Sequence, residues 1–175
     1  MTPAPEPADP RPDLTVAAFR RVAGRFATGI TVVTTVADGR DHAMTMNAFT
    51  SVSLDPLLVL FCVEKIARFH DTVLAQPTWA VSILGEHSEA ASSWFATRGR
   101  PLEAGLDGWK IHRGPRTGAP ILDEAIGALE CRTHAVHDAG DHTIVVGEVL
   151  AATTPAEAGP LIYFNGTYRT LREPA

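Results

Sequence analysis

Apolar and polar positions along the chain predict a mainly β protein with a few short helices. Continuous β-branched runs and alternating apolar and polar runs are typical of strands, and they give roughly seven or eight of them. Turn signals at Asp38-Gly39 and Gly140-Asp141 indicate hairpin connections, so an antiparallel barrel with peripheral helices is expected. The run at 57–63 is the most apolar and predicts a buried central strand. The other extended segments are 30–36, 42–46, 49–53, 79–84, one near 109–112, 129–136, 143–152, 161–164 and 168–171.

The first predicted helix starts near Val16, where Asp13 or Thr15 can cap it. Apolar side chains recur at helical spacing as far as Phe26, which predicts that one face of this helix packs inward. Residues 97–120 are rich in Gly, Pro and Arg and predict a long surface excursion around one strand. The remaining two helices are expected at 66–76 and 88–96.

Length and composition favour one globular domain. The chain has 175 residues, and its first 12 contain five prolines, which predicts a disordered tail before a domain at 13–175. The net charge is -5 without a basic block, which argues against nucleic acid or an anionic membrane as partner. No apolar run reaches the roughly 18 to 20 residues that span a bilayer.

The two cysteines, Cys62 and Cys131, lie in an apolar run and an alternating run. Two cysteines do not make a disulfide framework, so both are expected to be buried free thiols. Free thiols fit a reducing cytoplasm.

Three groups of segments carry the informative residue patterns. They are Phe26 to Thr35 continued by Ala43 to Val63; Leu129-Glu130-Cys131 followed by Gly140-Asp141-His142-Thr143 and Gly147-Glu148-Val149; and Pro160 to Phe164.

In this order and spacing, the segments closely resemble the flavin reductase family, the short-chain reductase component of two-component flavin monooxygenases. The resemblance runs from about Phe19 to Leu171. It implies an FMN-binding split barrel, with six antiparallel strands in Greek-key order, and usually a homodimer. It further implies that FMN or FAD binds near the dimer interface, that NADH or NADPH is oxidised, and that reduced flavin passes to a separate monooxygenase.

The resemblance places the flavin ring at the segment Ala43 to Ser53. An isoalloxazine ring needs small polar groups at its pyrimidine edge and apolar packing on its faces, and this segment offers both. Judged by composition alone, the same segment could be a solvated sheet face. Ala48 stands where the family commonly has Ser, so one hydroxyl is missing. The implied cofactor-binding residues here are Met44, Thr45, Asn47, Ala48, Ser51, Val52 and Ser53, with Cys62 on the following strand.

The phosphate-binding segment departs from the family pattern. The family usually has a Ser-x-Thr-His type segment after its central strand, and the hydroxyl positions are Ala67 and Phe69 here. Lys65 and Arg68 remain as partners for the flavin phosphate, unless they are solvated surface charges. The departure implies weaker FMN binding or room for FAD.

The Gly140-Asp141-His142 turn carries the nicotinamide nucleotide contact in the family. Gly140 allows the tight turn and Asp141 can orient His142. Hydride transfer itself needs orientation rather than an acid or base, so these two catalytic candidates are expected to position the nucleotide. Tyr163 can shape the nicotinamide pocket or simply pack in the core. No Rossmann motif is present, and no metal is expected because His134 and His137 would face opposite sides of a strand.

The predicted activity is an NAD(P)H:flavin oxidoreductase that supplies reduced flavin to a flavin-dependent monooxygenase. Two alternatives stay open at this point. One is a split-barrel module that binds flavin without turnover, and the other is an oxidase that holds its flavin tightly.

Overall fold

A computed structural model describes residues 14–101 and 105–171 of the chain; the predicted tail at 1–12 lies outside them. These residues form the three helices α1 (Val16–Ala23), α2 (Arg68–Leu74) and α3 (Glu89–Ala96). None of these helices has the length and apolar content that crossing a membrane requires. The strands are β1 (Thr28–Gly29), β2 (Thr31–Ala37), β3 (Arg40–Met46), β4 (Phe49–Leu54), β5 (Leu57–Glu64), β6 (Thr78–Leu84), β7 (Ile111–Arg113), β8 (Pro120–Leu122), β9 (Ala125–Ala139), β10 (His142–Thr153), β11 (Ile162–Phe164) and β12 (Thr167–Arg169).

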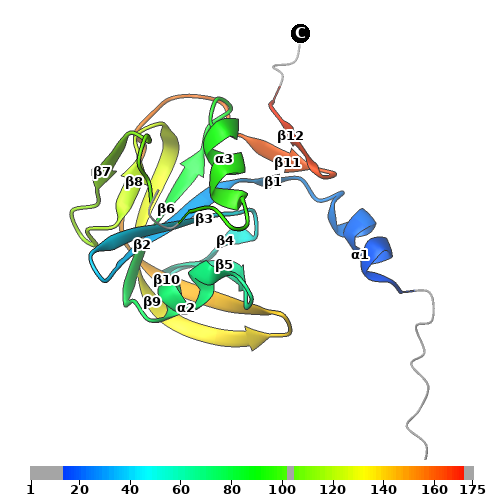
Figure 1. Cartoon of the computed structure of the whole chain (residues 1–175), viewed down its shortest axis with the longest axis horizontal. Helices are drawn as coiled ribbons and strands as arrows, with labels where there is room; N and C mark the ends of the chain where they lie inside the picture. The colour runs from blue at the N-terminus through cyan, green and yellow to red at the C-terminus, as the bar shows by residue number, and fades with distance from the viewer. Residues whose placement is uncertain (1–13, 102–104, 172–175) are drawn as a thin grey trace, which may run out of the picture.

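The architecture is dominated by one antiparallel sheet of seven strands, in the order β3-β2-β6-β9-β10-β5-β4 (Figure 1). Two small sheets, β1-β11-β12 and β7-β8, flank it. The mainly β, split-barrel fold predicted from the sequence is confirmed. The number of strands differs, because short strands such as β1 and β8 have too few residues to give a periodic pattern.

The large sheet curls around a hydrophobic core. Met46 of β3 and Phe61 of β5 come from strands far apart in the sheet order, yet both lie in this core. Register shifts in the β9–β10 pair, at Val146/Gly147 and Val149/Ala151, bend the two longest strands and help the sheet to curl. The buried members of this core are Val33, Met46, Val59, Phe61, Val63, Phe69, Val73, Trp79, Val81, Cys131 and Val145.

A second core lies under α3 and the small sheet. Ala91 and Phe95 of α3 are buried there against Leu84 of β6 and Leu122 of β8. Helix α2 instead contributes Phe69 to the first core. The two helices therefore serve separate cores, and the ends of both lie close to β3.

Helix α1 differs from its prediction in one respect. The Oγ1 of Thr15 accepts a hydrogen bond from the Ala18 amide at 3.1 Å, so the predicted cap is confirmed. The predicted inward packing is wrong, because no residue of α1 is buried and Phe19 and Val22 are 62% and 74% exposed. The helix stands away from the barrel (Figure 1), so its apolar face covers no surface among the described residues.

Two other expectations need correction. Strand β5 is not central but next to the edge strand β4, and only its alternate residues Val59, Phe61 and Val63 are buried. Burial is confirmed for Cys131, whereas Cys62 lies on the other side of β5 and is half-buried; both thiols are free. A continuous apolar run predicts a strand that is buried on both faces, whereas side chains such as Leu58 and Leu60 are only partly covered here.

Candidate functional site

A cavity of about 480 Å³ opens between β3, the start of α2 and the end of α3. Its wall comes from residues 41–45, Glu64, residues 66–69 and residues 95–100. Strand β3 positions the first group, and the tight connection between β5 and α2 positions the next two. Residues 95–100 are positioned by the end of α3 at Ala96 and by the Gly- and Arg-rich segment that comes after it.

Three of the predicted cofactor-binding residues line this cavity: Met44, Thr45 and Arg68. The Oγ1 of Thr45 donates to the backbone oxygen of Ser92 at 2.7 Å, which ties β3 to α3. Ala67, where the family has a hydroxyl, also lines the wall. The cavity therefore joins the end of the predicted ring segment to the predicted phosphate segment.

The other predicted ring residues lie on the neighbouring edge strand rather than in the cavity. Asn47 and Ala48 connect β3 to β4, and both are exposed. The backbone oxygen of Ala48 accepts from the Cys62 amide at 3.0 Å, which pairs the two predicted residues through the backbone. A register shift lies between Ser51 and Ser53. Strand β4 is the end of the large sheet, so one side of its backbone has no strand partner in the described part of the chain. The exposed ring candidates on β4 itself are Ser51 and Val52, and Ser53 is half-buried.

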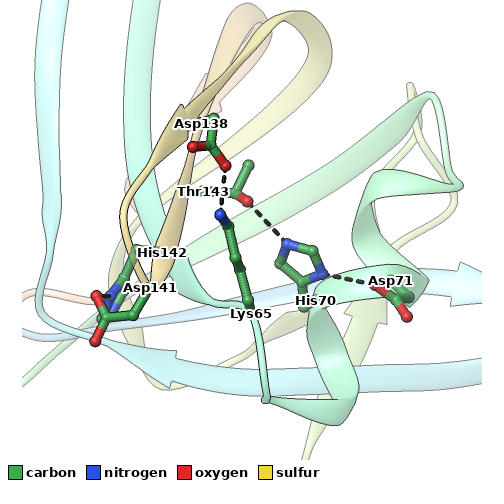
Figure 2. Close-up of polar contacts among 7 residues, drawn as sticks. All are labelled: Lys65, His70, Asp71, Asp138, Asp141, His142 and Thr143. Carbon is green, nitrogen blue, oxygen red and sulfur yellow. Dashed lines mark hydrogen bonds and ion pairs between the residues drawn. The ribbon is translucent and has the colours of Figure 1, made fainter. Parts of the chain in front are cut away.

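The basic residues around the cavity are only partly those predicted. The Nζ of Lys65 pairs with Asp138 on β9 and does not line the wall (Figure 2). Two arginines that were not predicted, Arg98 and Arg100, line it instead. Their sequence signal was the cluster of Gly and Arg after α3, which was assigned only to a surface excursion. Arg98 donates to Glu64 at 2.6 Å.

The predicted nucleotide contact lies at the β9–β10 hairpin. Gly140 has φ +67°, as the tight turn requires, and the Nδ1 of His142 donates to Asp141 at 2.7 Å. This hydrogen bond, and then the positive charge on His142, lower the pKa of the exposed Asp141 carboxyl. Across the β10–β5 pair His142 stands opposite Glu64, which lines the cavity. The hairpin is thus one strand away from the cavity wall.

A histidine that the sequence analysis did not select lies beside this hairpin. The Nδ1 of His70 contacts Asp71 at 2.6 Å, and its Nε2 contacts the Oγ1 of Thr143 at 2.8 Å (Figure 2). Thr143 is buried and follows His142 directly. The His70 contact therefore ties α2 to the strand that carries the predicted nucleotide residue.

Tyr163 lies apart from these groups. It belongs to β11 in the small sheet, opposite Thr28, and packs against Tyr168 with ring centroids 5.7 Å apart. Both tyrosines pack against the second core, and neither lines the cavity. Within this chain Tyr163 therefore packs in the core, which was the alternative to shaping a nicotinamide pocket.

The site thus has two parts that suit one elongated ligand. The exposed backbone and small polar side chains of β4 can hydrogen-bond a planar heteroaromatic ring, and the arginine-lined cavity can bind an anionic tail. None of the described side chains around it forms an activated nucleophile: burial raises the pKa of the Cys62 thiol, which keeps it protonated. The chemistry that fits is binding and orientation of cofactors rather than covalent catalysis.

Comparisons with known proteins show the family of this chain. The profile described as "Flavin reductase like domain" matches residues 23–172. An NADH-dependent FAD reductase of Streptomyces globisporus is 45% identical over 157 residues, which cover 86% of this chain and 83% of that protein. The reductase subunit HsaB of a flavin-dependent monooxygenase from Mycobacterium tuberculosis is 36% identical over 152 residues, covering 86% and 79%. The crystal structure of BorF, the flavin reductase component of a bacterial two-component tryptophan halogenase, superposes with a TM-score of 0.85 at 40% identity, over 91% of this chain and 100% of that one.

Proposed function

The chain belongs to the flavin reductase-like family, and from this premise we propose that it transfers a hydride from NADH or NADPH to FAD or FMN. It is an NAD(P)H:flavin oxidoreductase. The observation that carries this conclusion is the match of the family profile to residues 23–172, which contain both parts of the site. The relatives named above act with NADH on FAD, or serve as reductase components of two-component enzymes.

The residues of this chain fit a flavin. Arg100 lines the cavity of about 480 Å³, and its buried Nε has no hydrogen-bond partner among the described residues. Such an unpaired cation donor suits a phosphate oxygen. Met44 and Thr45 would contact the ring or ribityl chain, and Asn47 with the exposed part of β4 would meet the ring edge. A bound flavin supplies the two-electron acceptor, and the nicotinamide supplies the hydride.

The work of the protein in this reaction is orientation. Hydride transfer needs the two rings at short distance in the right orientation, and no residue has to take a proton for the hydride step itself. We assign His142 to holding the nicotinamide nucleotide. The hydrogen bond from His142 to Asp141 fixes the direction of the imidazole ring. Lys65 helps to fix the same turn, because its amide donates to the backbone oxygen of Asp141 at 2.9 Å.

The reduced flavin would leave for a separate flavin-dependent monooxygenase, as the naming of the relatives as reductase subunits supports. We further propose a homodimer. The exposed apolar face of α1, formed by Val16, Phe19 and Val22, supports it, because such a face covers a surface of another molecule more often than it meets water. We also propose that the protein is located in the cytoplasm, because its two cysteines are free thiols and a reducing compartment keeps them so.

The test follows NADH or NADPH absorbance with purified protein, with and without added FAD or FMN. Consumption that depends on added flavin supports the reductase. Consumption without added flavin, with flavin retained through gel filtration, indicates an oxidase that holds its flavin. Flavin binding without consumption of either nucleotide indicates a binding module, and both of these results contradict the proposal.

A further inference from the structure

The cavity keeps an excess of positive charge after its own ion pairs are counted. Its two carboxylates, Asp41 and Glu64, each have an arginine partner already. Arg113, from outside the wall, reaches Asp41 with Nη2 2.9 Å from Oδ2, and Arg98 donates to Glu64 at 2.6 Å. The acidic side chains of the cavity are therefore committed to other cations.

Arg68 and Arg100 are the cations that remain, and neither has a carboxylate partner in the described part of the chain. Arg100 is bound only to neutral groups. Its Nη2 donates to the backbone oxygen of Ala43 at 2.8 Å, its Nη1 donates to that of Gly105 at 3.2 Å, and its guanidinium lies 5.2 Å from the centre of the Phe95 ring. Burial, and then the charge of Arg68, lower the pKa of Arg100. An anion placed between the two arginines would remove this repulsion.

The two arginines converge on one part of the cavity. The Nη2 of Arg68 donates to the backbone oxygen of Arg100, which brings the two residues together. Apolar side chains of Met44, Ile66 and Phe95 also line the wall. A cavity of about 480 Å³ is in the range that holds a ligand of nucleotide size, so a single phosphate group would leave much of it unfilled.

We propose that Arg68 and Arg100 form a subsite for the diphosphate of a dinucleotide, the group that FAD and NADH share and FMN lacks. Two linked phosphates carry one negative charge each and match the two guanidinium groups, whose N–H donors beyond those that bind backbone oxygens can meet phosphate oxygens. The exposed side chain of Ile66, which also lines the cavity, would then meet the adenosine. The inference rests on the proposed function, which supplies FAD and NADH as the ligands.

The test measures flavin binding without NADH, by titrating flavin fluorescence with FAD, FMN and riboflavin. The variants are Arg68→Gln and, as a control, Arg132→Gln, which removes the same charge from an ion pair with Glu148 away from the cavity. If the diphosphate belongs to FAD, Arg68→Gln weakens FAD binding about tenfold or more, weakens FMN binding less than about threefold and leaves riboflavin unchanged. If it belongs to NADH, the flavin affinities stay constant and KM for NADH rises by about the same factor. Both results support the subsite.

Arg100→Lys is the second variant, since it keeps the charge and loses the fork; its folding is checked by circular dichroism. Equal weakening of FAD and FMN with KM for NADH unchanged would assign the arginines to one phosphate and overturn the inference, as would wild-type values in both variants. If the wild-type protein binds no flavin and consumes no NADH, the proposed function fails instead. Calorimetry with ADP then tests the subsite independently of the reaction. ADP binding by the wild type that is lost in Arg68→Gln supports the subsite. Equal binding by both proteins, or no binding by the wild type, rejects it.

Discussion

His70 and Thr143, 73 residues apart in the sequence, meet with Nε2 2.8 Å from Oγ1. The Nδ1 of His70 contacts Asp71 at 2.6 Å, so both ring nitrogens have a polar partner. The contact joins the helix that contributes Arg68 to the cavity with the strand that carries His142. One hydrogen bond therefore connects a helix of the cavity wall with the strand of the candidate nucleotide-binding residue.

Replacing Thr143 with Val should lower the free energy of unfolding by about 1–2 kcal/mol, because a nearly buried imidazole nitrogen loses its partner. Thr143→Ser keeps the hydroxyl and loses only a methyl group, so it should lose less stability than Thr143→Val. Urea unfolding measures both. If the Val and Ser variants have the same stability, the hydrogen bond does not contribute.

Gly147 and Trp79 give a prediction about packing. A Cβ built on Gly147 would lie 2.2 Å from Cζ2 of the fully buried Trp79 and 3.2 Å from Cβ of Cys131. Gly147→Ala should therefore destabilise the protein by about 1–3 kcal/mol or more, measured as a lower Tm. Gly29→Ala is the control, since no atom outside its chain neighbours lies within 4 Å of the new methyl group. Equal Tm values for the two variants would contradict the prediction.

Cys131 should make the protein less stable in alkali. Burial, and then the charge of Glu130, raise the pKa of this thiol from 9.0 to about 12. Between these values the folded state keeps a proton that the unfolded state has lost, so this contribution to stability declines as the pH rises above 9. At pH 10.5 the loss amounts to about 2 kcal/mol.

Cys131→Ala should remove this part of the alkaline decline, although it costs some packing at every pH. The measurement is urea unfolding at pH 8, 9.5 and 10.5, with Cys62→Ala as the control because that thiol is only half-buried. Stability curves of wild type and Cys131→Ala that run parallel over this range would show that the thiol does not titrate as described.

His142→Ala should raise KM for the nicotinamide nucleotide about tenfold, equivalent to about 1.4 kcal/mol of binding, and leave flavin affinity nearly unchanged. Asp141→Asn should have a smaller effect in the same direction, since it weakens only the hydrogen bond that orients the ring. His134→Ala, an exposed histidine of β9, is the control. An unchanged nucleotide KM in His142→Ala would rule out the role assigned to it.

The proposed dimer predicts that charge on the exposed face of α1 favours the monomer. Phe19→Asp combined with Val22→Asp should lower the mass measured by sedimentation from two chains to one, because burying two carboxylates in an apolar contact is unfavourable. Arg20→Asp changes the charge on the same helix without touching those two apolar side chains and should not dissociate it. A wild-type protein that sediments as a single chain would end the dimer proposal.

Much of this protein is determined by local sequence. The Thr15 cap, the Asp38-Gly39 hairpin with both residues at positive φ, and the alternating pattern of the strands follow from backbone preferences that act over a few residues. The ordered motifs were enough to identify the family and, through it, the reaction.

The tertiary structure decided which charges meet. Lys65 and Arg68 look equivalent in the sequence, yet Lys65 reaches Asp138 while Arg68 reaches the backbone of Arg100. The exposed face of α1 is likewise indistinguishable by pattern from a buried one. Periodicity reports which residues share a face, but pairing and covering depend on which distant segments the folded sheet brings together.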